Sequence, residues 1–384
     1  MERLATILGL LAVAMFVLSY QLKSRRNIIL TNAGSRVLYV AQYILLGAFE
    51  GALLDFMITL DDIRQPIANR LEEFEQFVRS SFNEKEGTLL AEMVEYILSS
   101  RGKGLRPALT MLVAAATSPS GNFGKRTMLA AMLIEMIHTA SLVHDDVIDE
   151  SAQRRGKASV NARWQSRNAV IIGDYILARN MDIGLKSGQY DLLTHIIGNM
   201  AVLCEGEILQ SDHAGKLNIS KEDYFDIIYK KTASLFGSCA SAGAMSVGAS
   251  RKTVESMHRF GEMVGMAFQI VDDILDYTPD NNTGKPAAND LQERKITLPL
   301  LEVMEQTPPE LKQQILSAVE RAATEPEAVE FIREQVERYN GVDRARQTLQ
   351  RFLQRALSEL SALADTPYRQ AMIDLCTFVA ERDR

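Results

Sequence analysis

Aspartates that could bind a metal occur in two clusters with the same spacing: two adjacent residues, then a third after two apolar positions. The clusters are Asp145, Asp146 and Asp149, and, 127 residues later, Asp272, Asp273 and Asp276. On a helix, positions i and i+4 share a face, so the outer two aspartates of each cluster project together with the second beside them. Carboxylates on a rigid element suit Mg²⁺, which binds through one or two carboxylates plus water and substrate phosphates. The clusters therefore predict a magnesium site for a phosphate-bearing substrate.

A single acidic pair at this spacing usually marks a solvated helix face, so the residues before each cluster decide the interpretation. Both clusters end helical stretches, 127–147 and 257–271, that are too apolar to face water. We therefore expect both sets of carboxylates to open into an interior cavity. Six carboxylates around one cavity would need several divalent cations to neutralise them.

Basic residues follow the clusters or stand at expected helix starts. Arginine binds phosphate oxygens through two parallel hydrogen bonds, and lysine acts as a point charge. Each basic pair alone would usually be a solvated surface, but their order along the chain with the aspartates favours phosphate binding. The segment GKGLRP (102–107) lacks the G-x-x-x-x-G-K-[ST] pattern, so it is not a nucleotide-binding P-loop. The basic residues are Lys103, Arg106, Arg154, Arg155, Lys230, Lys231, Lys285 and Lys295.

Long helices must position these groups. Apolar residues at i, i+3 and i+4 predict helices over 71–82, 89–98, 127–147, 166–183, 192–209, 256–275 and 329–363. Breaks are expected at Pro107, 118–124, Gly215, 279–286 and 307–309, and Asn340-Gly341 indicates a helix end rather than a hairpin. The sequence therefore predicts one all-α domain over 61–384, a single large helical bundle around a central cavity.

Composition and charge exclude several classes of protein. The 384 residues include 23 glycines and 10 prolines, few for this length, and 47% are hydrophobic, which favours a helical protein with a sizeable core. The formal net charge of −7 argues against a nucleic acid partner. Cys204, Cys239 and Cys376 are odd in number and lack CxxC spacing, which argues against a disulfide framework or a zinc site and fits a reducing cytosol.

The first sixty residues differ in composition and predict a membrane leader, 1–60. Residues 4–20 carry no charge and, as a helix, would reach about 26 Å, close to the bilayer core of about 30 Å. Lys23, Arg25 and Arg26 follow this run instead of preceding it, which argues against a signal peptide and places them on the cytosolic side. We therefore expect attachment to the inner membrane with the catalytic body in the cytoplasm.

A second apolar run, 37–60, contains Gln42, Glu50 and Asp55, and carboxylates are costly at the centre of a membrane. An interfacial or re-entrant segment is favoured, since full spanning would deliver the body to the outside. The stretch also resembles part of small bacterial inner-membrane proteins. The alternative is that both apolar runs are core helices of a soluble protein.

Taken in order, the motifs resemble those of the trans-isoprenyl diphosphate synthases, also called polyprenyl synthetases. The likeness runs from about Asp61 to beyond Leu300. At Glu293-Arg294-Lys295 the family often has an acidic residue, glycine and lysine, which leaves the role of Lys295 open. The matching motifs are GKGLRP (102–107), IHTASLVHDDVID (137–149), RRG (154–156), GDY (173–175), KT (231–232), GMAFQIVDDILD (265–276) and GK (284–285).

The resemblance implies the isoprenoid synthase fold and a division of roles among the residues. Both aspartate clusters would hold Mg²⁺ that bridges an allylic diphosphate. The residues completing that site would be Arg154, Lys231, Gln269 and Lys285, with Thr232 also binding substrate. The residues binding isopentenyl diphosphate would be Lys103, Arg106, His138 and Arg155. The catalytic residues would be Asp145, Asp149, Arg154, Lys231 and Asp272.

In the implied reaction, the allylic C–O bond breaks, the isopentenyl double bond attacks the allylic cation, and a proton passes to the departing diphosphate. Metal ions and fixed cations stabilise the charge that develops on that diphosphate. No protein base is required. His144, beside the first cluster, is therefore interpreted as a ring packed against a neighbouring helix.

Product length depends, in the family, on residues one helical turn before the first cluster. Ala140 and Ser141 are small here, which resembles the open form of long-chain synthases. We therefore expect long-chain all-trans products, as for quinone side chains, made by a homodimer. The alternatives are a geranylgeranyl or farnesyl diphosphate synthase, with the two small residues serving only close helix packing.

Functions of other classes were weighed against these motifs. A terpene cyclase shares the helical fold, but its second metal motif is typically an Asn/Ser/Glu set, whereas this chain has DDILD at 272–276. A silent subunit of a heteromeric synthase would normally have lost aspartates or arginines, and this chain has kept them. The remaining alternative is a non-catalytic, membrane-anchored scaffold, motivated by the leader alone.

Overall fold

The computed structural model describes Leu11 and residues 58–382, except Arg101, Lys103, Asn218 and 278–288. The predicted leader, 1–60, lies almost entirely outside the described residues, and so do the predicted diphosphate ligands Lys103 and Lys285. The second apolar run and the break expected at 279–286 also lie outside them, apart from residues 58–60.

The described body is helical apart from one antiparallel hairpin, β1 (Gln153–Arg154) with β2 (Lys157–Ala158), which confirms the all-α prediction. The helices between residues 60 and 276 are α4 (Leu60–Arg64), η1 (Gln65–Ile67), α5 (Ala68–Ser81), α6 (Leu89–Ser99), α7 (Leu105–Thr117), α8 (Lys125–Ile148), α9 (Val160–Lys186), α10 (Tyr190–Lys216), α11 (Lys221–Ile228), η2 (Tyr229–Ala233), α12 (Ser234–Ser246) and α13 (Arg251–Asp276). The later helices are α14 (Asn289–Gln292), α15 (Leu298–Met304), α16 (Pro309–Arg321), α17 (Pro326–Arg338), α18 (Gly341–Glu359), η3 (Leu360–Ala362) and α19 (Pro367–Glu381).

Most of the predicted helices are present, and the differences have physical causes. The stretch 329–363 is not one helix, because Asn340 adopts a left-handed φ of 53° between α17 and α18, the helix end that its sequence predicts. Pro107 does not break a helix. It lies in the first turn of α7, where its missing N–H has no intrahelical partner to lose. The periodicity missed α7 and α12, because helices buried on almost every side show no apolar stripe.

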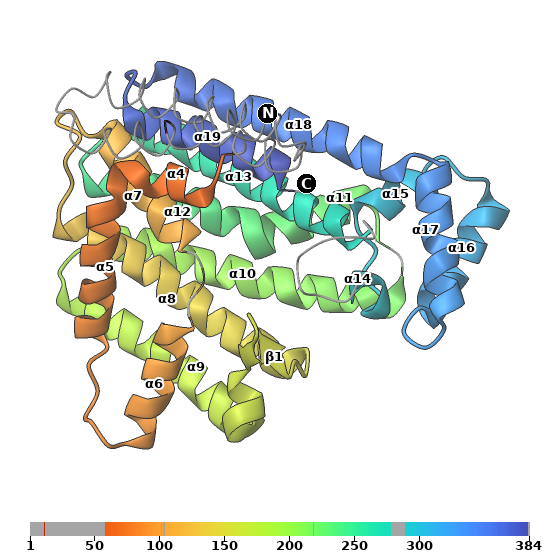
Figure 1. Cartoon of the computed structure of the whole chain (residues 1–384), viewed down its shortest axis with the longest axis horizontal. Helices are drawn as coiled ribbons and strands as arrows, with labels where there is room; N and C mark the ends of the chain where they lie inside the picture. Colours follow the sequence, from red (N-terminus) through yellow and green to blue (C-terminus); the bar gives the residue numbers. More distant parts are fainter. Residues whose placement is uncertain are drawn as a thin grey trace. The chain divides into compact units, whose positions relative to one another are not determined.

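The core of the bundle is centred on α12, which packs on α7, α8 and α13, while α7 also packs on α8. Most residues of α8 are buried, so its apolar side chains cover several sides instead of one stripe. Figure 1 shows α8, α10 and α13 running along the bundle, with α18 and α19 along one side and α16 and α17 at one end. The long core helices thus carry their C-terminal aspartate clusters on rigid supports.

A local signal fixes where α11 begins. The Ser220 hydroxyl accepts a hydrogen bond from the backbone N–H of Asp223, and the Asp223 carboxylate accepts one from the backbone N–H of Ser220. This reciprocal capping box satisfies two helix-end donors at once. Because α11 leads directly into η2, the cap also anchors the segment that carries Lys231.

Candidate active site

A cavity of about 1070 Å³ opens between the C-terminal ends of α8 and α13. Five of the six predicted aspartates line it, together with residues of α10, α11, η2 and the β hairpin. The expectation that both clusters face one interior space is therefore confirmed for these five. They are Asp145, Asp149, Asp272, Asp273 and Asp276.

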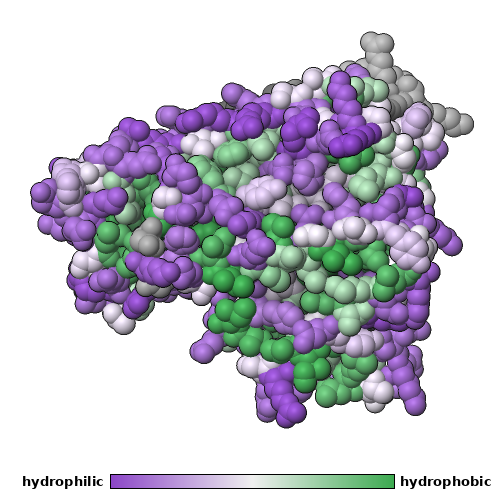
Figure 2. All heavy atoms as spheres, turned by 180° about the vertical axis from the view of Figure 1, so that it is seen from behind, coloured by the Kyte–Doolittle hydropathy of each residue, from purple (hydrophilic) through white to green (hydrophobic). Residues whose placement is uncertain are grey.

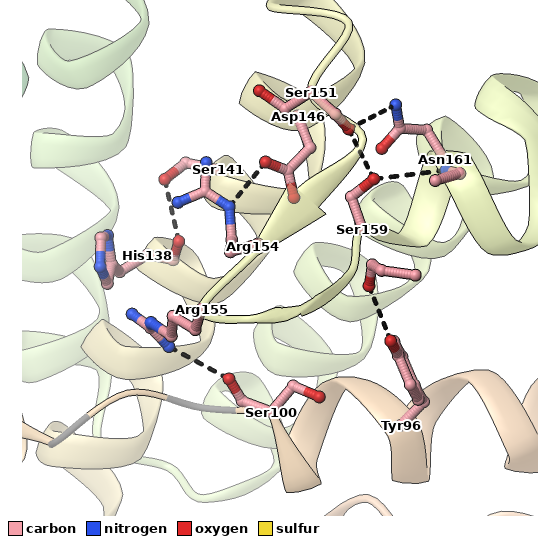
Figure 3. Close-up of polar contacts among 12 residues, drawn as sticks. Tyr96, Ser100, His138, Ser141, Asp146, Ser151, Arg154, Arg155, Ser159 and Asn161 are labelled. Carbon is pink, nitrogen blue, oxygen red and sulfur yellow. Dashed lines mark hydrogen bonds and ion pairs between the residues drawn. The ribbon is translucent and has the colours of Figure 1, made fainter. Parts of the chain in front are cut away.

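The sixth aspartate, Asp146, does not line this cavity, so that part of the expectation is wrong. Its side chain is only 2% exposed, and its Oδ1 accepts a hydrogen bond of 2.6 Å from Nε of Arg154. Figure 3 shows Arg154 reaching from the hairpin to this carboxylate. Successive helix positions are about 100° apart, so the neighbour of a cavity-facing residue can point into the packing instead.

Asp273, the matching residue of the second cluster, is held in a similar way. It is 2% exposed, and its carboxylate accepts hydrogen bonds from the Tyr224 hydroxyl at 2.6 Å and from Nε2 of Gln269 at 2.9 Å. Burial raises the pKa of Asp273 well above its usual range. In both clusters, protein groups therefore hold the second aspartate, and Asp273 still reaches the cavity wall, whereas Asp146 does not.

The surroundings of Asp145 disfavour its charged form. Burial, together with the neighbouring carboxylates Glu207 and Asp149, raises the pKa of Asp145 to about 7 against the opposing charge of Lys231. A cation bound beside Asp145 would remove this penalty. The donor set, which consists of carboxylate oxygens, is the type that Mg²⁺ prefers.

The way in which the residues would hold a metal also fits Mg²⁺. Among the described residues, no three His, Cys, Asp or Glu side chains lie close enough together to hold an ion by themselves. Mg²⁺ characteristically binds through one or two carboxylates and completes its shell with water and substrate phosphates. The outer aspartates of each cluster could hold Mg²⁺ in this manner once a diphosphate is present.

Lys231 and Thr232 reach the same cavity from η2, a π-helical segment between α11 and α12. The Lys231 ammonium donates to Oε2 of Glu207 at 2.8 Å and to Oε1 of Gln210 at 2.7 Å. The Thr232 hydroxyl donates to Oε1 of Gln269 at 2.9 Å. The structure thus brings Lys231, Thr232 and Gln269 together as the sequence predicted. Single π turns occur often at functional sites because they re-aim a few side chains.

A second group of cations lines the same cavity near His138, two turns of α8 before Asp145. Figure 3 shows Arg155 beside His138, with the backbone of Ser100 below. Burial and the charges of Arg106 and Arg155 hold the pKa of His138 well below 6.5, so its ring is neutral at pH 7. Burial also lowers the pKa of Arg106, whose Nε has no hydrogen-bond partner in the described part of the chain. An anion bound here would satisfy these donors.

The hairpin aims Arg155 through an unusual backbone conformation. Arg155 (φ 53°) and Gly156 (φ 75°) form a two-residue turn between β1 and β2 with both φ values positive. Tight hairpins favour such turns, but a non-glycine residue in this region costs about 1–2 kcal/mol. Nη1 of Arg155 donates to the carbonyl of Ser100 at 3.2 Å. The strain is consistent with a side chain placed for function.

His144 packs against a neighbouring helix, as predicted. Its Nε2 lies 3.2 Å from the carbonyl oxygen of Val170 and 3.4 Å from Oδ1 of Asp174, both on α9. The two residues expected to control product length are placed differently from one another. Ser141 lines the cavity, whereas Ala140 is fully buried and does not line it.

Several polar residues of the cavity were missed by the sequence patterns. Glu207 and Gln210 lie three positions apart on the apolar helix α10. Two polar residues on one face of an apolar helix are a signal from which the sequence could have predicted them. Nη1 of Arg382 lies 2.9 Å from Oδ1 of Asp272, and its guanidinium stacks 4.4 Å from the ring of Phe268. No local pattern marked Arg382, which follows α19. Lys295, whose role was left open, also lines the cavity.

Known proteins resemble this chain over most of its length. The octaprenyl diphosphate synthase of Escherichia coli (strain K12) is 36% identical over 77% of this chain and 91% of its own length. A decaprenyl diphosphate synthase structure from Rhodobacter capsulatus has a TM-score of 0.78 at 30% identity, covering 84% of this chain and 99% of that chain. A polyprenyl synthase from Caulobacter crescentus CB15, complexed with calcium and isoprenyl diphosphate, has a TM-score of 0.77 at 28% identity, with 85% and 98% covered.

Two families match different parts of the chain. Residues 3–74 match a bacterial inner membrane protein family, which suggests association with the inner membrane. That match ends within α5, past the leader boundary predicted at residue 60. Residues 87–336, most of the body with both aspartate clusters, match polyprenyl synthetase. The chain therefore belongs to the polyprenyl synthetase family and is a prenyltransferase of the all-α isoprenoid synthase fold.

Proposed function

We propose that the chain condenses isopentenyl diphosphate with an allylic diphosphate in a Mg²⁺-dependent reaction that yields long-chain all-trans polyprenyl diphosphate. One observation carries the proposal. Two pairs of cavity-facing carboxylates, Asp145 with Asp149 and Asp272 with Asp276, share a cavity with a separate group of cations around Arg106 and Arg155. The carboxylates suit a metal-bridged diphosphate, and the cations suit a diphosphate bound without metal.

At the allylic site, the protein must stabilise the diphosphate as its C–O bond to the allylic carbon breaks. Bound Mg²⁺ would supply Lewis-acid stabilisation of that leaving group. Lys231 stands beside the same space and would add a fixed positive charge. Arg154 lines the cavity while holding Asp146, so it would serve both the second aspartate and the leaving diphosphate. Lys285 is proposed at this site from its motif.

At the second site, Arg106, Arg155 and the neutral His138 would bind the diphosphate of isopentenyl diphosphate, with Lys103 proposed from its motif. Glu135, 6% exposed on α8, acts electrostatically on both arginines and offsets part of their charge. The isopentenyl double bond then attacks the allylic carbon. The proton lost from the new product passes to the released diphosphate, so no described side chain is needed as a base.

The proposal of long products rests on Ser141 and on the relatives. A serine at the cavity wall leaves room for a growing chain, and the Escherichia coli relative is named for an octaprenyl product. Products of this kind would serve as quinone side chains. A geranylgeranyl or farnesyl diphosphate synthase is the alternative, and it would stop at a short product.

We also infer a homodimer. Large apolar side chains on α9 and α10 are exposed, among them Ile171 at 56%, Leu185 at 55% and Ile208 at 70%. Two described helices, α8 and α10, are long and apolar enough to cross a membrane. The most apolar stretch of α8 is 78% buried inside the protein, whereas that of α10, within Tyr190–Ala214, is only 28% buried. Apolar side chains gather in patches on the face seen in Figure 2. A second copy would cover such a surface.

The apolar leader, 1–60, would moor the enzyme to the inner membrane, with the catalytic body in the cytoplasm. Hydrophobic anchoring resists salt, whereas charge attachment is screened by it. Salt at about 1 M shortens the screening length about threefold relative to physiological salt. Detergent, but not such salt, should therefore release the full-length chain from membranes. Recovery of the full chain in the soluble fraction would contradict this mooring.

The central experiment incubates purified full-length protein with Mg²⁺, farnesyl diphosphate and radiolabelled isopentenyl diphosphate. Dephosphorylated products are separated by reversed-phase chromatography. Labelled long-chain alcohols support the proposal, labelled alcohols of fifteen or twenty carbons support the short-chain alternative, and no incorporation supports the non-catalytic scaffold. Removal of Mg²⁺ with a chelator should abolish incorporation.

A further inference from the structure

A chain of polar side chains outside the cavity joins α10, α12 and α13 to the first residue of η2. Its members are His195, Ser241, His258, Glu262 and Tyr229. The two histidines and Ser241 join α10, α12 and α13, and Glu262 then continues the chain to Tyr229. None of the five lines the substrate cavity described above. The proposed reaction therefore leaves their role open.

His258 stands between Ser241 and Glu262. The Ser241 hydroxyl donates to the carbonyl of Gly237 at 2.7 Å, and its oxygen lies 3.2 Å from Nδ1 of His258 and 2.7 Å from Nε2 of His195. Nε2 of His258 lies 3.1 Å from Oε1 of Glu262. A carboxylate beside one ring nitrogen favours the imidazolium form, which can donate to both neighbours. In agreement, the hydrogen bond to Glu262 raises the pKa of His258 above 6.5.

The charged pair then binds Tyr229. Its hydroxyl donates to Oε1 of Glu262 at 2.9 Å. Burial pushes the pKa of Glu262 up, but the hydrogen bond and charge of His258, with the bond from Tyr229, outweigh it and lower the pKa. Glu262 is therefore an ionised acceptor, and charged acceptors make the stronger hydrogen bonds. Tyr229 is the residue at which the π-helical segment begins.

The rest of η2 is held by close backbone contacts on two sides. A Cβ at Gly206 of α10 would lie 2.7 Å from the backbone nitrogen of Lys231, and one at Gly265 of α13 would lie 2.6 Å from Cα of Ala233. Both contacts are possible only for glycine. The middle and the end of η2 are thus closely packed, and Tyr229 at its beginning is tied to α13 by its hydroxyl.

We propose that the His258–Glu262–Tyr229 chain is a positioning device that sets the start of η2 and thereby aims Lys231 and Thr232 at the allylic diphosphate. The proposal rests on the proposed function, because it takes Lys231 and Thr232 as ligands of that diphosphate. The three residues touch no substrate. Their loss changes where two cavity groups point, not the charge of the cavity.

The test uses full-length protein with Tyr229→Phe, Glu262→Gln and the double variant. Tyr229→Phe keeps the ring and removes only the hydroxyl. We expect each single change to raise KM for the allylic diphosphate about five- to twentyfold, because misaligned groups lose part of a charge-assisted contact. KM for isopentenyl diphosphate should stay within about twofold of the wild-type value. The double variant should match the single variants, because both break one chain.

Tyr190→Phe is the matched control. It removes a hydroxyl from a tyrosine that is 62% exposed at the start of α10 and does not line the cavity. This control should leave both KM values unchanged. An unchanged allylic KM in Tyr229→Phe, an equal rise in both KM values, or additive effects in the double variant would overturn the proposal.

A binding measurement separates this inference from the proposed function. Calorimetric titration of the wild type and of Tyr229→Phe with inorganic diphosphate and Mg²⁺ reads the allylic diphosphate site without turnover. Weaker binding in Tyr229→Phe, with a melting temperature close to that of the wild type, supports the positioning role. Equal binding overturns it, whether or not the wild type incorporates isopentenyl diphosphate.

Discussion

Gly102→Ala should impair isopentenyl diphosphate binding by moving Arg155 without removing its charge. A Cβ at residue 102 would lie 2.5 Å from Nη2, 2.6 Å from Cζ and 2.8 Å from Nη1 of Arg155. Carbon and nitrogen atoms in contact stand about 3.5 Å apart, so the guanidinium must withdraw by about 1 Å. The atoms displaced belong to the flexible end of a side chain, so the fold should tolerate the change.

The expected magnitude follows from the contact that is displaced. A hydrogen bond to a charged group contributes about 1.5–3 kcal/mol, and about 1.4 kcal/mol corresponds to a tenfold change in affinity. Gly102→Ala should therefore raise KM for isopentenyl diphosphate by roughly 10- to 100-fold, up to the effect of Arg155→Ala. The allylic KM should change little, because Arg155 does not approach that diphosphate in the proposed arrangement.

Steady-state kinetics with each substrate varied in turn would measure the effect. Gly124→Ala is the matched control, since a Cβ there meets nothing within 4 Å. The double variant Gly102→Ala, Arg155→Ala should be no worse than Arg155→Ala alone, because both act through one guanidinium. A wild-type KM in Gly102→Ala, or additive losses in the double variant, would refute the reasoning.

Four further outcomes are expected. Asp145→Asn and Asp272→Asn should each lower kcat by orders of magnitude in the radiolabel assay, because each removes a carboxylate from a site for the leaving group's metal; near-wild-type turnover would contradict it. Ser141→Phe should shorten the alcohols seen by reversed-phase chromatography, whereas an unchanged length distribution would place the limit elsewhere. Ile208→Asp should shift the protein from dimer to monomer in analytical ultracentrifugation. His258→Gln should lose the most stability, measured by thermal melts, between pH 4.5 and 6.5, the ordinary pKa values of Glu262 and His258. The raised pKa of His258 stabilises the fold below 6.5, and the lowered pKa of Glu262 stabilises it above 4.5. An equal loss at pH 9, about 2.5 units above that window, would refute the charged pair.

The sequence predicted the fold and the outer aspartates because both depend on local spacing. Asp145 and Asp149, four apart on a helix, must share a face wherever the helix lies. Asp146 was misplaced for the same reason. Its orientation depends on Arg154, eight residues away on a hairpin, and helix periodicity contains no information about that partner.

Other cavity residues depend on contacts between distant segments. Arg382 reaches Asp272 from the end of the chain, 110 positions later, and Tyr224 reaches Asp273 from α11. No spacing rule joins such pairs, since only the packed helices bring them together. The π-helical form of η2 was equally hidden, because Lys230-Lys231-Thr232 gives the same expectation for an ordinary helix start.

The position of the two clusters on their helices explains why this cavity is poised for cations. Asp145 stands in the last turn of α8, and Asp272, Asp273 and Asp276 stand at the end of α13; neither last turn contains a basic residue. A helix C-terminus carries about half a unit of negative charge and favours cations, so carboxylates there repel the helix end as well as one another. Stability alone would select against this arrangement twice over. Protein donors hold the second aspartate of each cluster, so the repulsion that remains is among the outer aspartates, and a magnesium-bound diphosphate in the cavity would relieve it.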